Sequence, residues 1–272
     1  MNTNSNVYTV VYSAIMVVVV AIVLTVVSVG LKPQQKINMD NEKRINILKC
    51  AGIEVDESKA EETFNKAVVE SFVVDSLGNK TNDDAFSIKD NLIVFKTVVK
   101  DGVVKKEVKL PIFKVENNGQ FYYVVPLKGK GLWGAIWGYA ALKEDFNTIN
   151  GVVFAHASET PGLGAKMTED FFTSQFVGKE MSENGKFVGV NVYKDSKKTA
   201  EDPKHGIDAI SGSTMTTNGV KNMVNDCLQA YEPLKKTLSS TSASAPAVDN
   251  TDTVSEPVPD APAADSTQNV IK

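Results

Sequence analysis

The chain has 272 residues, of which 42% are hydrophobic and 23% charged, as in a globular protein with one sizeable domain plus appendages. Its net charge of −4 and the lack of a basic stripe argue against a nucleic-acid partner. Part of the acidity lies near the C-terminal end, so the folded part is closer to neutral. The acidic residues there are Asp249, Asp252, Glu256, Asp260 and Asp265.

The N-terminal stretch has the composition of a membrane anchor. Residues 7–31 are almost wholly apolar, and no charged residue precedes Lys32. This length is enough to span a bilayer with some tilt, and Tyr8 and Tyr12 suit the interface at one end. A cleaved signal peptide would need a basic start and a shorter apolar core. We therefore expect one permanent transmembrane helix over residues 7–31.

The charges after this segment bear on its orientation. Lys32, Lys36, Lys43 and Arg44 follow the apolar run, and nothing positive precedes it. The positive-inside rule would then place the following domain in the cytoplasm, although the rule weakens when a long domain follows the helix. Charge alone leaves the sidedness open.

Two short helices are expected next. Residues 41–53 form an amphipathic pattern, and a second helix should begin near Ser58, where Ser58 and Glu61 have the spacing of a capping box.

Most of the following segments have the pattern of strands. Turn residues at 75–78 and 100–102 separate the first of them. The expected strands are residues 71–76, 92–99, 103–115, 121–127, 152–156 and 186–193, with a short helix at 169–176 between the last two. The fold class is therefore α+β, with a mostly antiparallel sheet and flanking helices.

Residues 129–139 are rich in glycine with aromatic residues interleaved. One interpretation is a tight loop and a strand, in which Trp133 and Trp137 share a face and Gly134 and Gly138 permit close packing. The other is a wall for a planar ligand. Composition does not decide between them.

Residues 159–164 read Glu-Thr-Pro-Gly-Leu-Gly, which predicts a loop with unusual backbone angles. A loop so dense in glycine could bring bare backbone N–H groups against a ligand, or could serve packing alone.

Residues 208–216 form a turn of small residues that leads into a helix. Thr217 or Asn218 is the expected N-cap of that helix. Backbone N–H groups and short hydroxyls near a helix N-terminus suit a phosphate, but such a turn also serves merely to cap a helix. The apolar face of the helix comprises Val220, Met223, Val224, Cys227, Leu228 and Tyr231.

The two cysteines and two histidines of the chain suggest no separate chemistry. Cys50 and Cys227 each lie on an apolar helical face and are expected to be buried thiols, with a disulfide between them left open. No CxxC pair indicates an iron–sulfur or zinc site, and His156 and His205 lie far apart in sequence. We expect no metal site and no catalytic nucleophile–base pair.

The end of the chain, residues 239–272, consists mainly of Ser, Ala, Pro, Thr and Asp without periodicity. It cannot bury a core and is expected to be a disordered low-complexity tail.

Three motifs together resemble one family. Gly-Lys-Gly-Leu-Trp-Gly at 129–134, Glu-Thr-Pro-Gly-Leu-Gly-Ala at 159–165 and Asp-x-x-Ser-Gly-x-Thr at 208–214 occur in this order. The chain thereby resembles the C subunit of the sodium-translocating NADH:quinone oxidoreductase, over its length to roughly Leu238. The resemblance implies an FMN-binding domain over residues 32–238.

The resemblance also implies a covalent cofactor. In that family one FMN is attached to a threonine through a phosphoester bond, and the corresponding residue here is Thr214. Asp208, Ser211, Gly212 and Ser213 would be recognised by a separate flavin transferase. Ser213 stands where the family usually has alanine.

The flavin ring would lie against the two other motifs. The resemblance implies contacts with Trp133 and with the loop residues Glu159, Thr160, Leu163 and Gly164. The cofactor would supply the chemistry, and the protein its position and electrostatics.

By this resemblance the chain is an electron-carrying component of a sodium-translocating NADH:quinone reductase. It would relay electrons one at a time between an iron–sulfur centre and another flavin in partner subunits. The complex lies in the bacterial inner membrane, with this domain on the periplasmic side, which conflicts with the charge pattern.

Two alternatives stay open. The homologous G subunit of the ferredoxin:NAD electron-transport complexes shares the attachment motif, but the run at 128–133 and the long insert before Leu127 favour the quinone-reductase family. A non-redox membrane-anchored binding module, with the glycine loops serving only packing, is the other alternative.

Overall fold

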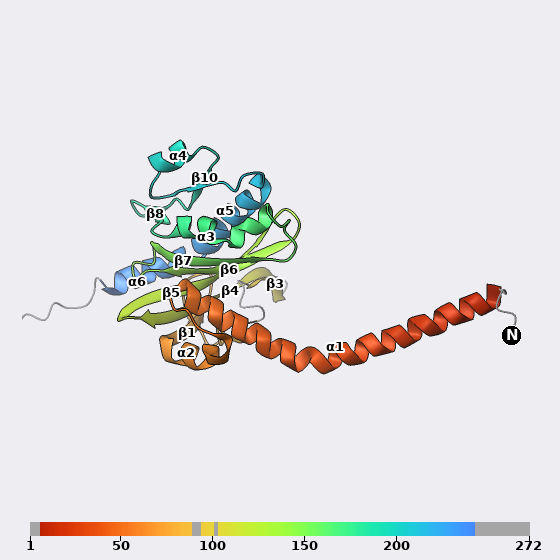
Figure 1. Ribbon diagram of the computed structural model, residues 1–272. Coiled ribbons are helices and arrows are strands. Elements are labelled where there is room, and N and C mark those ends of the chain that lie inside the picture. The colour runs from red at the N-terminus through yellow and green to blue at the C-terminus, as the bar shows by residue number, and fades with distance from the viewer. Residues whose placement is uncertain (1–5, 89–93, 101–102, 243–272) are drawn as a thin grey trace, which may run out of the picture.

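The computed structural model describes residues 6–88, 94–100 and 103–242. It has the expected α+β architecture, with an antiparallel sheet between two layers of helices and loops (Figure 1). The expected strand start at 92–93, the turn at 101–102 and residues 243–272 of the expected tail lie outside the described residues.

Helix α1 (Asn6–Cys50) is one continuous element of 45 residues. The apolar stretch and the helix expected at 41–53 are thus not separate. Pro33 removes one backbone hydrogen bond, but the surrounding residues continue the helix past it. The C-terminal end of α1 packs against the sheet, while the apolar stretch extends away from it and is exposed (Figure 1). The helix is long and apolar enough to cross a membrane.

A short 3-10 turn, η1 (Glu57–Lys59), precedes helix α2 (Ala60–Ala67). The expected capping box is wrong, because the N-cap of α2 is Lys59 and no side chain caps it. Glu61 instead accepts a hydrogen bond from the guanidinium of Arg44 on α1, at 3.3 Å. This contact ties α2 to the base of α1.

The main sheet has the strand order β2-β1-β4-β5-β6-β7, and β3 pairs with β4. Every pair in it is antiparallel. The strands are β1 (Val68–Val74), β2 (Lys80–Thr81), β3 (Val94–Lys100), β4 (Val103–Asn117), β5 (Gln120–Lys130), β6 (Ala135–Leu142) and β7 (Ile149–His156). Asn118 and Gly119 both have positive φ and form the two-residue turn between β4 and β5.

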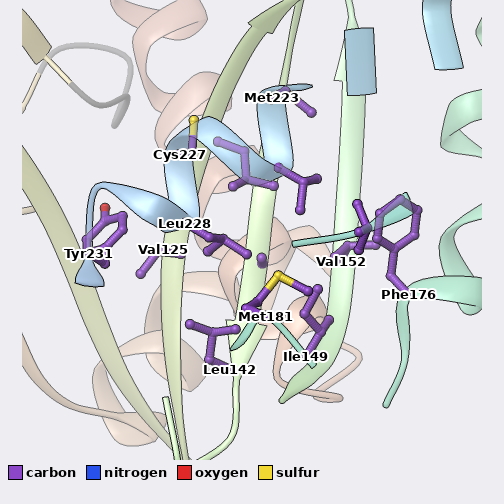
Figure 2. Packing of buried hydrophobic residues seen from close by; sticks show 14 of the residues in the cluster. Val125, Leu142, Ile149, Val152, Phe176, Met181, Met223, Cys227, Leu228 and Tyr231 are labelled. Carbon is purple, nitrogen blue, oxygen red and sulfur yellow. The ribbon is translucent and has the colours of Figure 1, made fainter. Parts of the chain in front are cut away.

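Alternate residues of the sheet face two separate cores. Val124 packs with Ile47 and Phe64 from α1 and α2, whereas the next residue, Val125, packs with the helices of the C-terminal half. Figure 2 shows part of the second core, where Leu228 lies beside Val125.

The two cysteines belong to different cores. Cys50 lies in the first and Cys227 in the second, and both are buried free thiols. Burial of the thiols is therefore confirmed, and the sheet between the two cores rules out a disulfide between them.

The second core is covered by the C-terminal half of the chain. Its elements are η3 (Gly164–Thr168), α3 (Asp170–Thr173), η4 (Ser174–Phe176), β8 (Ser182–Glu183), β9 (Lys186–Phe187), β10 (Asn191–Tyr193), α4 (Ser196–Glu201), β11 (Gly206–Asp208), α5 (Thr214–Gln229) and α6 (Glu232–Ser242). Strands β8 and β9 pair with each other, and β10 pairs in parallel with β11.

The single strand expected at 186–193 is wrong, because the segment is split into β9 and β10. Gly189 between them has φ of +73°, and a Cβ atom there would overlap the side chain of Asn225. The Asn225 amide accepts a hydrogen bond from the Val190 N–H at 2.8 Å and donates one to its carbonyl at 3.0 Å. These two hydrogen bonds attach the segment between β9 and β10 to α5.

Helix α6 was not anticipated from the sequence. It continues through Ser242, so residues 239–242 at the start of the expected tail are helical. Just before it, the buried Tyr231 hydroxyl donates a hydrogen bond to the Pro111 carbonyl on β4, at 2.9 Å.

Helix α5 lies lengthwise on β5. Three residues one helical turn apart meet three consecutive residues of the strand, and two of the six are glycines. Gly219 approaches the Lys130 carbonyl, Met223 packs on Gly129, and the Cys227 thiol donates a hydrogen bond to the Lys128 carbonyl at 3.4 Å. The start of α5 consequently lies at the end of the sheet where β5 turns into β6.

The buried thiol of Cys227 should make stability fall in alkali. Burial raises its pKa from 9.0 to about 11. Above pH 9 the unfolded chain releases this proton while the folded chain keeps it, so the free energy of unfolding should fall by up to about 3 kcal/mol by pH 11. Denaturant titrations of the full chain in detergent, followed by tryptophan fluorescence, should show a shallower fall for Cys227→Ala.

Each protein is compared with its own value at pH 8, which removes the cost of the lost side chain. Burial also raises the pKa of the Cys50 thiol, so part of the fall should persist in the variant. Equal slopes for the two proteins between pH 9 and 11 would contradict the prediction.

Candidate functional site

The turn at 208–216 forms the N-terminus of α5. The helix begins at Thr214 with Ser213 as N-cap, four to five residues before the expected cap. Gly212 has φ of +75° and reverses the chain into the helix. Thr217 is internal instead: its hydroxyl accepts from the Ile210 N–H at 3.1 Å and donates to the Ser213 carbonyl at 2.9 Å. Hydrogen bonds between its own residues therefore hold the turn in shape.

The hydroxyl groups of this turn differ in access. Thr216 and Thr217 are 1% and 0% exposed, and both are hydrogen-bonded. Ser213 is also buried, whereas Ser211 is exposed and Thr214 is half-buried. Only Ser211 and Thr214 among these five residues present a hydroxyl that another molecule could reach.

Ser213 carries an unsatisfied polar atom. Its Oγ is buried and has no hydrogen-bond partner, and the side chain does not cap the helix. The first backbone N–H groups of α5, from Thr214 on, have no acceptor within the helix. The site thus presents unused donors beside the Thr214 hydroxyl, which is the arrangement that a phosphate requires.

Glu159 joins the three motif segments. Its side chain is only 4% exposed. One carboxylate oxygen accepts from the Trp133 N–H at 2.9 Å, and the other accepts from the Thr216 hydroxyl at 2.6 Å. Its own N–H donates to Nδ1 of His156 on β7, at 3.2 Å. Because the residue is buried and both oxygens accept hydrogen bonds, the carboxylate is held inside the site.

Glycines make room for this carboxylate. A Cβ atom at Gly131 would overlap one oxygen of Glu159, and a Cβ atom at Gly164 would overlap the other and also crowd the Thr216 hydroxyl. Gly131 of the first motif and Gly164 of the second therefore serve close approach to Glu159, which sequence alone could not show.

Trp133 has a fixed backbone and a free ring. Its N–H is held by Glu159, and its carbonyl accepts from the Ser158 hydroxyl at 3.2 Å. The residue lies in the turn between β5 and β6 and is 65% exposed. It does not share a strand face with Trp137, which lies within β6. An indole held at the surface in this way is available to a planar ligand.

Backbone hydrogen bonds near the loop's own residues hold the loop at 159–164 in shape. The Thr160 carbonyl accepts hydrogen bonds from the N–H groups of Leu163 and Ala165, both at 3.1 Å. Gly162 has φ of +74°. The Leu163 side chain reaches the turn at 208–216, since its Cδ2 lies 3.1 Å from where a Cβ of Gly212 would be. The second and third motifs are therefore in direct contact.

Asp208 faces a different neighbour. Its carboxylate accepts hydrogen bonds from the hydroxyls of Ser196 and Thr199 on α4, and its N–H donates to the Gln175 side chain at 2.7 Å. Asp208 thus anchors α4 at the start of the turn at 208–216.

Large apolar side chains are exposed around Thr214. Met215 is 64% exposed, and Leu132, Trp133 and Leu163 are also exposed. We call these four residues the apolar rim. The predicted site did not include Leu132, which lies within the first motif, or Met215, which directly follows the third. Their apolar side chains beside predicted site residues are the signal that could have identified them.

The fold and the site together define a domain suited to a ligand that carries both a phosphate and a planar ring. The family described as FMN-binding domain matches residues 131–229, from the β5–β6 turn to the end of α5, and so includes all the residues that meet at this site.

Comparison of the whole chain identifies the family more closely. The C subunit of the Na(+)-translocating NADH-quinone reductase of Pasteurella multocida is 35% identical over 208 residues, covering 72% of this chain and 79% of that protein. The crystal structure of the same subunit from Parabacteroides distasonis is 34% identical, with a TM-score of 0.64, covering 75% of this chain and 96% of that one. NqrC of Shewanella oneidensis is 27% identical, with a TM-score of 0.60, covering 74% and 98%. The chain belongs to the NqrC family, the C subunits of the Na(+)-translocating NADH-quinone reductases.

Two of the three buried hydroxyls of the turn, those of Ser213 and Thr217, should respond oppositely to removal. Ser213→Ala deletes a buried hydroxyl without a partner, so the free energy of unfolding should stay unchanged or rise by up to about 1 kcal/mol. Thr217→Val, the matched control, deletes a hydroxyl with two partners and should cost about 1–3 kcal/mol. Denaturant unfolding measures both, and a clear loss of stability in Ser213→Ala would contradict the assignment.

Proposed function

We propose that this chain is the FMN-carrying subunit of a sodium-translocating NADH:quinone reductase and holds one FMN through a phosphoester bond to Thr214. The observation that carries the proposal is the access of the Thr214 hydroxyl at the N-terminus of α5, where the other hydroxyls of the turn, except that of Ser211, are buried. Family membership supports the assignment of the cofactor.

The residues around Thr214 suit the phosphate of FMN. The N–H groups at the start of α5 and the unpartnered Ser213 hydroxyl can donate hydrogen bonds to phosphate oxygens. Gly212 has no side chain to obstruct the approach, and Ser211 flanks the turn at the surface.

The flavin ring would find its contacts on the apolar rim. Trp133 and Leu163 present exposed apolar surface from two different loops, and the backbone of Thr160 shapes the loop that carries Leu163. Glu159 and Gly164 would support this surface from behind. Asp208 would keep the turn in shape for recognition by a flavin transferase.

Attachment requires an activated phosphate. The oxygen of the Thr214 hydroxyl would form a bond to the flavin-side phosphorus of a flavin–adenine dinucleotide held by a separate flavin transferase. The phosphoanhydride bond of that donor would then break, AMP would leave, and the hydroxyl proton would be released. This chain supplies the nucleophile's position, and the transferase supplies the activation.

The bound FMN would accept and release electrons, relaying them between redox centres in other subunits of the complex. The bond to Thr214 keeps the cofactor from diffusing away. The apolar rim leaves one side of the flavin open towards a partner subunit. Helix α1 would hold the domain at the inner membrane, with the domain on the periplasmic side.

The attachment residue can be tested directly. Thr214→Ala in the full chain, coexpressed with a flavin transferase, should yield no flavin fluorescence on a denaturing gel and no FMN-sized increment in intact mass. Ser211→Ala is the matched control because it removes the other accessible hydroxyl. If Thr214 is the attachment residue, this variant should still show both signals, even where the loss of a residue that the transferase recognises slows attachment. A fluorescent Thr214→Ala protein would move the attachment to Ser211, since Ser213, Thr216 and Thr217 are buried.

The sidedness of the domain can be tested with an introduced cysteine. Ser174→Cys places a thiol at an exposed position, and it should react with a membrane-impermeant maleimide in intact spheroplasts. The unmodified chain is the control, because Cys50 and Cys227 are buried and burial raises the pKa of each thiol. Reaction only after lysis would place the domain in the cytoplasm, as the basic residues after residue 31 suggest.

A further inference from the structure

Glu159 occupies the centre of the site without reaching its surface. Its two oxygens bind one group on each side: the Trp133 N–H of the β5–β6 turn and the Thr216 hydroxyl of the first turn of α5. Thr216 lies two residues after Thr214. One side chain thus sets the distance between the Trp133 turn and Thr214.

The surroundings of Glu159 indicate that its length matters more than its charge. Within the described residues, both hydrogen-bond partners of the carboxylate are neutral, and none of the ion pairs found involves it. A Cβ atom at Gly131 or Gly164 would overlap one of its oxygens, so both neighbouring segments pack directly against the carboxylate and its reach determines where they lie.

We infer that Glu159 is the positioning residue of the flavin-attachment site, which fixes the Thr214 hydroxyl relative to the Trp133 turn through the reach of its side chain. This inference rests on the proposed function. Glu159 touches neither the flavin nor the reacting atoms; it acts through Thr216 and the backbone of Trp133. A group held about 1 Å away from its productive position can lose on the order of a hundredfold in rate.

Two substitutions separate reach from charge. Glu159→Gln keeps the length, an acceptor for the Trp133 N–H and a polar group for Thr216, but removes the charge. Glu159→Asp keeps the charge and shortens the side chain by one methylene. The rate of FMN attachment to the full chain by a flavin transferase, measured by intact mass, should stay within about threefold of the unmodified chain in Glu159→Gln. It should fall at least about tenfold in Glu159→Asp.

The same bond can be tested from its other end. Thr216→Val is nearly isosteric and deletes only the hydroxyl, so attachment at Thr214 should again slow at least about tenfold, although Thr216 carries no flavin. Thr216→Ser should restore the rate. Amide hydrogen exchange of the Trp133 N–H gives a readout independent of labelling: it should be faster in Glu159→Asp and stay protected in Glu159→Gln. If Glu159→Asp does not fold, judged by its thermal melt, the Thr216 pair decides alone.

The outcomes distinguish this inference from the proposed function. An unmodified chain that takes up no FMN would overturn the proposed function. An unmodified chain that is labelled at Thr214, with Thr216→Val labelled equally fast, would overturn the positioning role alone. Glu159→Gln as slow as Glu159→Asp would show that the charge, not the reach, is required, and would also overturn the inference.

Discussion

The structure depends on the packing of α5 along β5. Gly219, Met223 and Cys227 are spaced by one helical turn and meet successive residues of one strand, which fixes both the direction and the depth of the helix on the sheet. Glycines on both elements allow this close approach. Because the helix cannot slide, its first turn must lie where β5 turns into β6. The turn at 208–216 and the Trp133 turn are therefore neighbours although they are far apart in sequence.

At this junction a buried carboxylate replaces apolar packing. Glu159 satisfies one donor from each neighbouring segment, and such a group is costly to bury unless its hydrogen bonds are made. The cost favours a single arrangement of the three loops over looser ones. The same junction buries Thr216 and Thr217 in bracing roles and leaves the Thr214 hydroxyl accessible. Which hydroxyls stay available to another molecule therefore depends on which ones the fold buries.

The opposite face of the sheet holds the end of α1. The last residues of α1 pack there with α2, and Cys50 and Asn117 bind this end of α1 to the strands. The rest of α1 leaves the domain as a continuous helix (Figure 1). The domain is therefore joined to its expected anchor without a flexible linker, which restricts the positions that the site can take relative to a membrane.

Much of this could be predicted from the sequence, because it depends on local pattern. Hydrophobic periodicity determined the α+β class, most of the strands and the long apolar helix, and the order of three short motifs identified the family. The start of α5 at Thr214, the break at Gly189 and the role of Glu159 were decided only by tertiary structure. A strand break or a buried carboxylate depends on partners far away in sequence, here Asn225 and Thr216. The start of α5 depends on the Thr217 hydroxyl accepting from the Ile210 N–H across the turn, and the hydrophobic pattern records none of these hydrogen bonds.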